Sequence, residues 1–154
     1  MIDTPEIVLT EPRHAAVIRL AIPREAIRAV MGPAIAEVMA ALEAQGLAAS
    51  GPVFSHHYRM DPAFFDFDVG IPVDGIVAPT GRVKEGRLPG AKAARTVYHG
   101  GYEGLGAAWG ELEAWVASRE LERAPDLWEC YLAGPESSPD PADWRTELVQ
   151  PLLG

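Results

Sequence analysis

Asp68-Val69-Gly70-Ile71-Pro72-Val73 and Glu147-Leu148-Val149-Gln150-Pro151-Leu152 share one pattern: an acid, a branched apolar residue, two variable positions, a proline and a branched apolar residue. The second stretch begins 79 positions after the first, and Leu88 follows Leu9 at the same offset. Matches that recur at one spacing indicate an internal duplication. Two similar modules can pack about a pseudo-twofold axis, and we expect a ligand groove between them.

Hydrophobic spacing predicts the same order of elements in each half of the chain. Each half reads as strand, helix, strand, strand, which predicts an α+β fold with mostly antiparallel sheets and helices on one face. We expect one domain over residues 1–154, with module one at about 5–73, a linker at about 74–82 and module two at about 83–152. The expected strands are 7–10, 15–21, 53–60, 65–73, 83–88, 93–98, 127–133 and 144–152, and the expected helices are 24–45 and 102–119.

Two local expectations concern the Gly-Pro and Pro-Gly pairs of the sequence. Gly32-Pro33 lies inside the first helix, and proline removes a helix hydrogen bond. We therefore expect a short first turn, a break, and a main helix with Pro33 near its start. The pair 83–88 and 93–98 is expected to form around Pro89-Gly90.

Composition restricts the class of protein. The 154 residues are 48% hydrophobic and 23% charged, as in globular domains, and no apolar run is long enough to span a bilayer. Cys130 is the single cysteine, and residues 1–6 do not resemble a secretion signal, so a cytoplasmic location is expected. The net charge of -9 disfavours binding to nucleic acid or to an anionic membrane, and no helix-turn-helix segment is evident.

Several cofactor signatures are missing from the sequence. There is no Gly-Lys-Ser/Thr phosphate loop, and the glycines near position 100 do not follow the dinucleotide fingerprint, so no cofactor is expected. His56 and His57 are neighbours on an expected strand and face opposite ways, so no metal site is expected.

The second half carries a family resemblance in three stretches: 88–94 with 98–102, 128–132, and 144–152. Together they resemble the GyrI-like effector-binding family, whose members occur alone or as ligand-sensing domains of AraC-type and MerR-type regulators. The resemblance covers nearly the whole chain and implies a duplicated β-α-β-β fold with a ligand groove between modules. It also places Glu129 where the family often has a glutamate that faces lipophilic cations.

Strand alternation gives an independent argument for Glu129. Glu129 and Tyr131 point to one face of the expected strand, while Trp128, Cys130 and Leu132 point to the other. We expect the apolar set to pack against a helix, which sends Glu129 and Tyr131 toward the groove. The alternative without a ligand is a glutamate that pairs with Arg or Lys, or lies exposed on an edge strand.

Aromatic residues supply the remaining site candidates. Tyr98 and Tyr131 are expected to flank the Glu129 carboxylate, while Trp109 lies on the apolar stripe of a helix and is expected in the core. His57 falls where Tyr131 falls in the other half. The expected ligand-binding residues are Glu129, Tyr131, Tyr98, His57, Tyr102 and Phe67.

Three functions fit these residues. The first is a stand-alone binder of small, lipophilic, drug-like or cationic molecules, for sensing or sequestration. The second, implied by the resemblance, is a hydrolase of electrophilic cyclopropane-bearing genotoxins, in which Glu129 activates water and Tyr98 or Tyr131 donates a proton. The third, also implied by the resemblance, is a modulator whose partner is gyrase or a transcription regulator.

Overall fold

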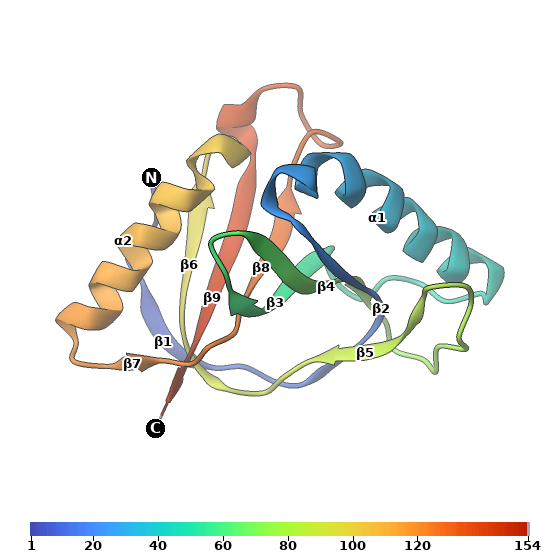
Figure 1. Cartoon of the computed structure of the whole chain (residues 1–154), viewed down its shortest axis with the longest axis horizontal. Helices are drawn as coiled ribbons and strands as arrows, with labels where there is room; N and C mark the ends of the chain where they lie inside the picture. Colours follow the sequence, from blue (N-terminus) through green and yellow to red (C-terminus); the bar gives the residue numbers. More distant parts are fainter. Residues whose placement is uncertain (154) are drawn as a thin grey trace. The chain divides into compact units, whose positions relative to one another are not determined.

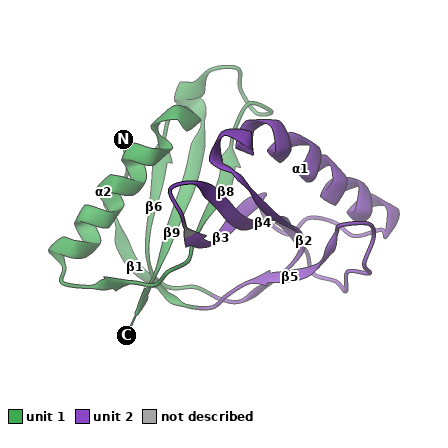
Figure 2. Ribbon diagram, in the orientation of Figure 1, with its two compact units in different colours: residues 1–10, 91–154 green, residues 11–90 purple. Residues whose placement is uncertain are grey.

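The computed structural model describes residues 1–153, except for the side chain of Met60. The chain divides into two compact units (Figure 2). Unit 1 comprises residues 1–10 and 91–154, and unit 2 comprises residues 11–90. No helix in the described residues is both long and apolar enough to cross a membrane.

Unit 2 is an antiparallel four-stranded sheet with one α-helix (Figure 1). Its strand order is β5-β2-β4-β3. The helix packs on β2 and β4. The elements are β2 (Arg13–Pro23), α1 (Ile27–Ala44), β3 (Phe54–Met60), β4 (Phe64–Pro72) and β5 (Lys84–Leu88).

Unit 1 repeats this arrangement with the strand order β1-β6-β9-β8, and its helix packs against β6. A strand of two residues, β7, pairs with the end of β9. The matching strand orders and the antiparallel pairing confirm the predicted α+β fold, while the groove between modules stays a prediction. The elements are β1 (Glu6–Leu9), β6 (Lys92–His99), α2 (Leu105–Ser118), β7 (Glu122–Arg123), β8 (Leu127–Ala133) and β9 (Arg145–Leu153).

The first strand of each repeat belongs to the other unit. β1 pairs with β6, from Glu6 opposite Arg95 to Leu9 opposite Lys92, and β5 pairs with β2. The prediction that 83–88 and 93–98 pair around Pro89-Gly90 was therefore wrong. Proline and glycine are common at turns, but the residues on either side of Pro89-Gly90 pair with β2 and with β1, and not with each other.

The helix α1 runs unbroken through Pro33, so the expected break there was wrong. A 3-10 turn at Arg24–Ala26 precedes it, which matches the expected short first turn. Pro33 and Ala29, whose carbonyl loses its hydrogen bond, are both exposed, so water can satisfy that carbonyl. Burial of Val38 and Leu42, worth about 1.5–3 kcal/mol each, offsets the cost of about 3 kcal/mol for an interior proline.

Two other features of unit 2 close its core. Gly46 ends α1 at φ +67°, and the Leu47 N–H donates to the Leu42 carbonyl at 2.9 Å, a Schellman-type stop. The expected linker 74–82 folds back onto unit 2, since Val77 and the adjoining Val83 are buried with the α1 face in one core cluster.

Candidate functional site

The register of unit 1 places Glu129 on the face of the sheet that α2 covers. Glu129 lies directly opposite Leu148, which is buried against α2 in the core cluster of unit 1. Directly opposed residues on neighbouring strands point to the same face. Strand alternation therefore sets Tyr131 on that face too, as expected.

The prediction that Trp128, Cys130 and Leu132 pack against the helix was wrong. Trp128 is opposite Val149, so it points away from the α2 face, as does Cys130. Leu132 lies in a β-bulge between Tyr131 and Ala133 and is 48% exposed. Alternation separates two faces but does not say which one a helix covers, and here the helix covers the polar one.

The Glu129 carboxylate accepts two hydrogen bonds from neutral donors. The indole Nε1 of Trp109 donates to Oε2 at 2.7 Å, and the Tyr131 hydroxyl donates to Oε1 at 2.9 Å. Across residues 1–153, no Arg or Lys forms an ion pair with this carboxylate. The expected flanking by Tyr131 is present, and the alternative, a pairing with Arg or Lys, is not.

Burial dominates the electrostatics of this carboxyl group. Although part of the Glu129 side chain remains exposed, the carboxyl itself is enclosed, and desolvation raises its pKa. The hydrogen bonds from Trp109 and Tyr131 act in the opposite direction, because they stabilise the ionised form. The ionised carboxylate therefore lacks a countercharge and would gain from a cation.

Two further aromatic rings continue from Tyr131. Tyr102 meets the ring of Tyr131 edge-on, with centroids 6.1 Å apart, and lies 5.1 Å from the ring of Trp144. Burial raises the pKa of Tyr102, and the negative charges of Glu136 and Glu129 raise it further. Tyr102 is 37% exposed, so its ring is reachable from solvent. We call Glu129, Trp109, Tyr131, Tyr102 and Trp144 the Glu129 cluster.

We expected Tyr98 to flank this carboxylate, but it does not. Its hydroxyl donates to the Gly101 carbonyl at 2.8 Å, and its ring is buried in the core of unit 1. The flanking position that we expected for Tyr98 is taken by Trp109.

His57 and Phe67 lie in unit 2 at the places that Tyr131 and Thr146 occupy in unit 1. His57 is opposite Phe67, and a bulge follows between His57 and Arg59, as it does after Tyr131. The two rings stack with centroids 4.8 Å apart, and burial lowers the pKa of His57 to about 4. The position of Glu129 is held by Ser55, so this half carries an uncharged, packed version of the site.

A separate polar group lies on the other face of the unit 2 sheet. The Tyr58 hydroxyl donates to the carboxylate of buried Asp68, and the guanidinium of Arg19 lies 4.0 Å from the centre of the Tyr58 ring. Arg19 also bonds Asp66 at 2.9 Å. The acid Asp68 is buried like the apolar residues beside it, and Tyr58 donates to its Oδ2.

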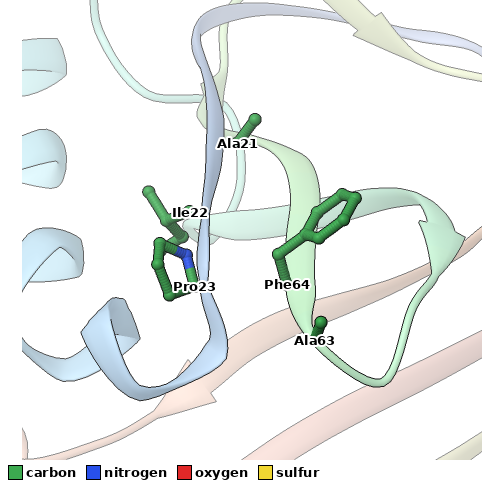
Figure 3. Close-up of a pocket in the computed structure, with 5 residues that line it drawn as sticks. All are labelled: Ala21, Ile22, Pro23, Ala63 and Phe64. Carbon is green, nitrogen blue, oxygen red and sulfur yellow. The ribbon is translucent and has the colours of Figure 1, made fainter.

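An apolar hollow of about 320 Å³ lies where β2 ends and β4 begins (Figure 3). Ala21, Ile22, Pro23, Ala63 and Phe64 line it. It contains none of the predicted site residues and no ionisable side chain, so it offers no charge selectivity.

A family match covers nearly the whole chain. A model of the GyrI-like small molecule binding domain matches residues 3–153. The chain belongs to this family. No curated protein matches the chain.

Several solved structures share the fold of this chain at low sequence identity. The EcmrR C-terminal domain is 18% identical with a TM-score of 0.85, and 97% of each chain is covered. In an EcmrR–DNA complex, the match at 20% identity and TM-score 0.84 covers 97% of this chain but spans only 57% of the EcmrR chain. SAV2435 bound to tetraphenylphosphonium is 10% identical with a TM-score of 0.72, covering 99% of this chain and 95% of that one. A hydrolase from Listeria innocua is 15% identical with a TM-score of 0.62, covering 97% and 91%.

Sequence reasoning missed two members of the cluster in this GyrI-like chain. Trp109 was assigned to the core by its place on the helical stripe, and its ring does pack there. Its indole N–H, however, needs an acceptor when buried, and that requirement was the available signal. Trp144 follows a loop rich in Pro and Ser, where no periodicity indicates which way a ring turns.

Proposed function

We propose that this chain binds a lipophilic aromatic cation at the Glu129 cluster, as a sensing or sequestering protein. The observation that carries the proposal is an enclosed carboxylate whose hydrogen bonds come from Trp109 and Tyr131, both neutral. A bound cation would supply the missing countercharge. Tetraphenylphosphonium bound to the similar protein SAV2435 supports this ligand class.

The two parts of the cluster would contribute differently to binding. An aromatic face attracts a cation by about 0.5–2 kcal/mol, depending on desolvation. An enclosed carboxylate interacts more strongly at close range, because water screens the pair less. Glu129 would therefore select for charge, and the rings of Tyr102, Tyr131 and Trp144 would select for flat or aromatic shape.

The test compares tetraphenylphosphonium with the neutral triphenylphosphine oxide by isothermal titration. Glu129→Gln keeps the shape of the side chain and removes its charge. We expect it to weaken tetraphenylphosphonium binding by about 1.5–3 kcal/mol, the range for hydrogen bonds to charged groups, and to change binding of the neutral compound far less. Glu111→Gln, on the exposed side of α2, is the matched control for net charge and should change neither. Equal losses for the two ligands would show that Glu129 shapes the fold and does not select charge.

A second candidate function is hydrolysis of a cyclopropane-bearing electrophile, and the 2.9 Å contact between Tyr131 and Glu129 favours it. Burial raises the pKa of this carboxyl group, which makes its carboxylate a stronger base than that of an exposed glutamate. Glu129 would take a proton from water as its oxygen attacks a ring carbon. The breaking C–C bond would send its electrons to a conjugated carbonyl oxygen, which Tyr131 would protonate.

Product analysis separates the two candidates. A hydrolase would release many ring-opened molecules per protein molecule, with the water oxygen incorporated from ¹⁸O-labelled solvent. Tyr131→Phe and Glu129→Gln should each lower turnover more than binding, because they act in the transition state. Saturable binding with unchanged ligand would rule out hydrolysis and leave the binding proposal in place.

A further inference from the structure

Thr146 carries a buried hydroxyl that has no hydrogen-bond partner. The residue is on β9 and is 0% exposed. Its Oγ1 makes no hydrogen bond with any group in residues 1–153. Buried polar groups are bonded in the large majority of cases, because an unpaired one loses its hydrogen bonds to water without replacement. The Thr146 hydroxyl therefore carries a desolvation cost that no hydrogen bond within residues 1–153 offsets.

The register places this hydroxyl beside the Glu129 cluster. Thr146 is directly opposite Tyr131 on one side and directly opposite Tyr98 on the other. All three side chains consequently lie on the α2 face, where Glu129 also lies. Directly opposed side chains on neighbouring strands start about 4.5–5.5 Å apart, so the Thr146 hydroxyl is within reach of a group held by Tyr131 and Glu129.

The fold itself does not need a hydroxyl at this position. Phe67 holds the equivalent place in unit 2, is fully buried, and stacks on His57. The same strand position is thus compatible with a purely apolar side chain. A valine in unit 1 would fill the same volume as threonine without an unpaired polar atom.

The buried hydroxyl and indole donors nearby are already engaged. Trp109 and Tyr131 donate to Glu129, Tyr98 donates to the Gly101 carbonyl, and Trp144 donates to the Ser138 carbonyl. Among the buried donors beside the cluster in residues 1–153, the Thr146 hydroxyl is left for a hydrogen-bond acceptor. Glu129, in contrast, supplies acceptors and a negative charge.

We propose that Thr146 is a specificity-determining residue whose hydroxyl donates to an oxygen of the ligand, so that the site prefers aromatic cations that also carry a carbonyl or ether oxygen. This inference rests on the proposed function of the Glu129 cluster. Entry of the ligand would displace the ring of Tyr102, which is partly exposed and packs on Tyr131.

The experiment uses the full chain and a matched ligand series. Tetraphenylphosphonium is compared with its three analogues that bear one acetyl group at the ortho, meta or para position of one ring. At least one analogue should bind about threefold to tenfold more tightly than the parent ion, as expected for one added hydrogen bond. Thr146→Val should remove that gain, so that the analogue binds no more tightly than the parent ion does to the same variant, whereas Thr146→Ser should retain it.

A second measurement does not depend on the ligand. If the hydroxyl is unpaired in the free protein, Thr146→Val should raise the melting temperature, because it removes a buried polar atom at constant volume. A lower melting temperature would mean that water or a neighbour satisfies the hydroxyl, and it would overturn the inference. So would an acetyl analogue whose advantage survives in Thr146→Val, or a series in which no analogue exceeds the parent.

These outcomes are distinct from failure of the proposed function. If Glu129→Gln weakens all four cations equally while Thr146→Val changes none of their ratios, the binding site stands and the role of Thr146 is wrong. If none of the four cations binds the unmodified protein, the proposed function is wrong and the inference that rests on it is wrong too.

Discussion

The indole nitrogen of Trp109 lies 2.7 Å from Glu129 Oε2 and ties the middle of α2 to β8. This bond fixes the orientation of a carboxylate that lacks a countercharge. It joins β8 to α2, whose apolar side chains pack in the core of unit 1. The position of the helix and the protonation of the carboxyl group are therefore linked.

Removing this donor should raise the pKa of Glu129 further. Trp109→Phe keeps an aromatic ring and deletes the N–H that stabilises the ionised carboxylate. A hydrogen bond to a charged group is worth about 1.5–3 kcal/mol, which corresponds to roughly one to two pH units. Carbon-detected NMR titration of the Glu129 carboxyl group measures this shift. Trp115→Phe, on the same helix, is the control and should leave the titration in place.

Cation binding should strengthen as pH rises. The raised pKa of Glu129 means that the carboxyl group stays protonated at pH values where an exposed glutamate is ionised. Only the ionised form attracts a cation, so affinity for tetraphenylphosphonium should increase by about tenfold per pH unit below that pKa and level off above it. Calorimetry in two buffers of different ionisation enthalpy should detect proton release on binding. The profile should be flat for Glu129→Gln, and a sloping profile in that variant would assign the titration to another group.

His57 should make the free protein less stable in mild acid. Its pKa is about 4 in the folded chain against 6.5 as the ordinary value, so the unfolded chain takes up the proton first. The stability from neutral His57 is fully present above pH 6.5 and is lost as pH falls toward 4, by up to about 3 kcal/mol. Denaturant unfolding of His57→Phe, which retains the stacked ring, should show a smaller loss over that range. His14→Gln, whose histidine is 64% exposed, should lose stability as the unmodified protein does.

Gly104 should not tolerate a side chain. A Cβ at this position would overlap the Tyr98 hydroxyl, which is held by its bond to Gly101. We expect Gly104→Ala to lower the free energy of unfolding by about 1–3 kcal/mol, as overpacking does. Gly110→Ala, on the exposed side of α2 with no atom within 4 Å, should instead raise it by about 1 kcal/mol. Adding Tyr98→Phe to Gly104→Ala should restore part of the loss, and no restoration would point to a backbone cause.

Local patterns predicted most of the elements but not their partners. The helical spacing of Val38 and Leu42 and the alternation of Phe65 to Val69 located α1 and β4, because these patterns reflect burial on one face. Alternation also placed Glu129 and Tyr131 together. It did not reveal that α2 covers that face, because the choice depends on how a distant helix packs. For the same reason, Tyr98 was predicted beside the carboxylate where Trp109 lies. Sequence spacing does not specify which aromatic ring extends from its own element to a neighbouring strand.

The reciprocal pairing of β1 with β6 and of β5 with β2 has an evolutionary consequence. A polypeptide with one copy of the repeat would keep its first strand but would have no second copy to receive it. Two such chains could complete each other by exchanging that strand as a symmetric dimer. Fusion of two gene copies would convert this exchange between chains into one within a chain. After fusion, each copy could mutate separately, and Glu129 in one copy against Ser55 in the other is the kind of divergence that a symmetric dimer cannot have.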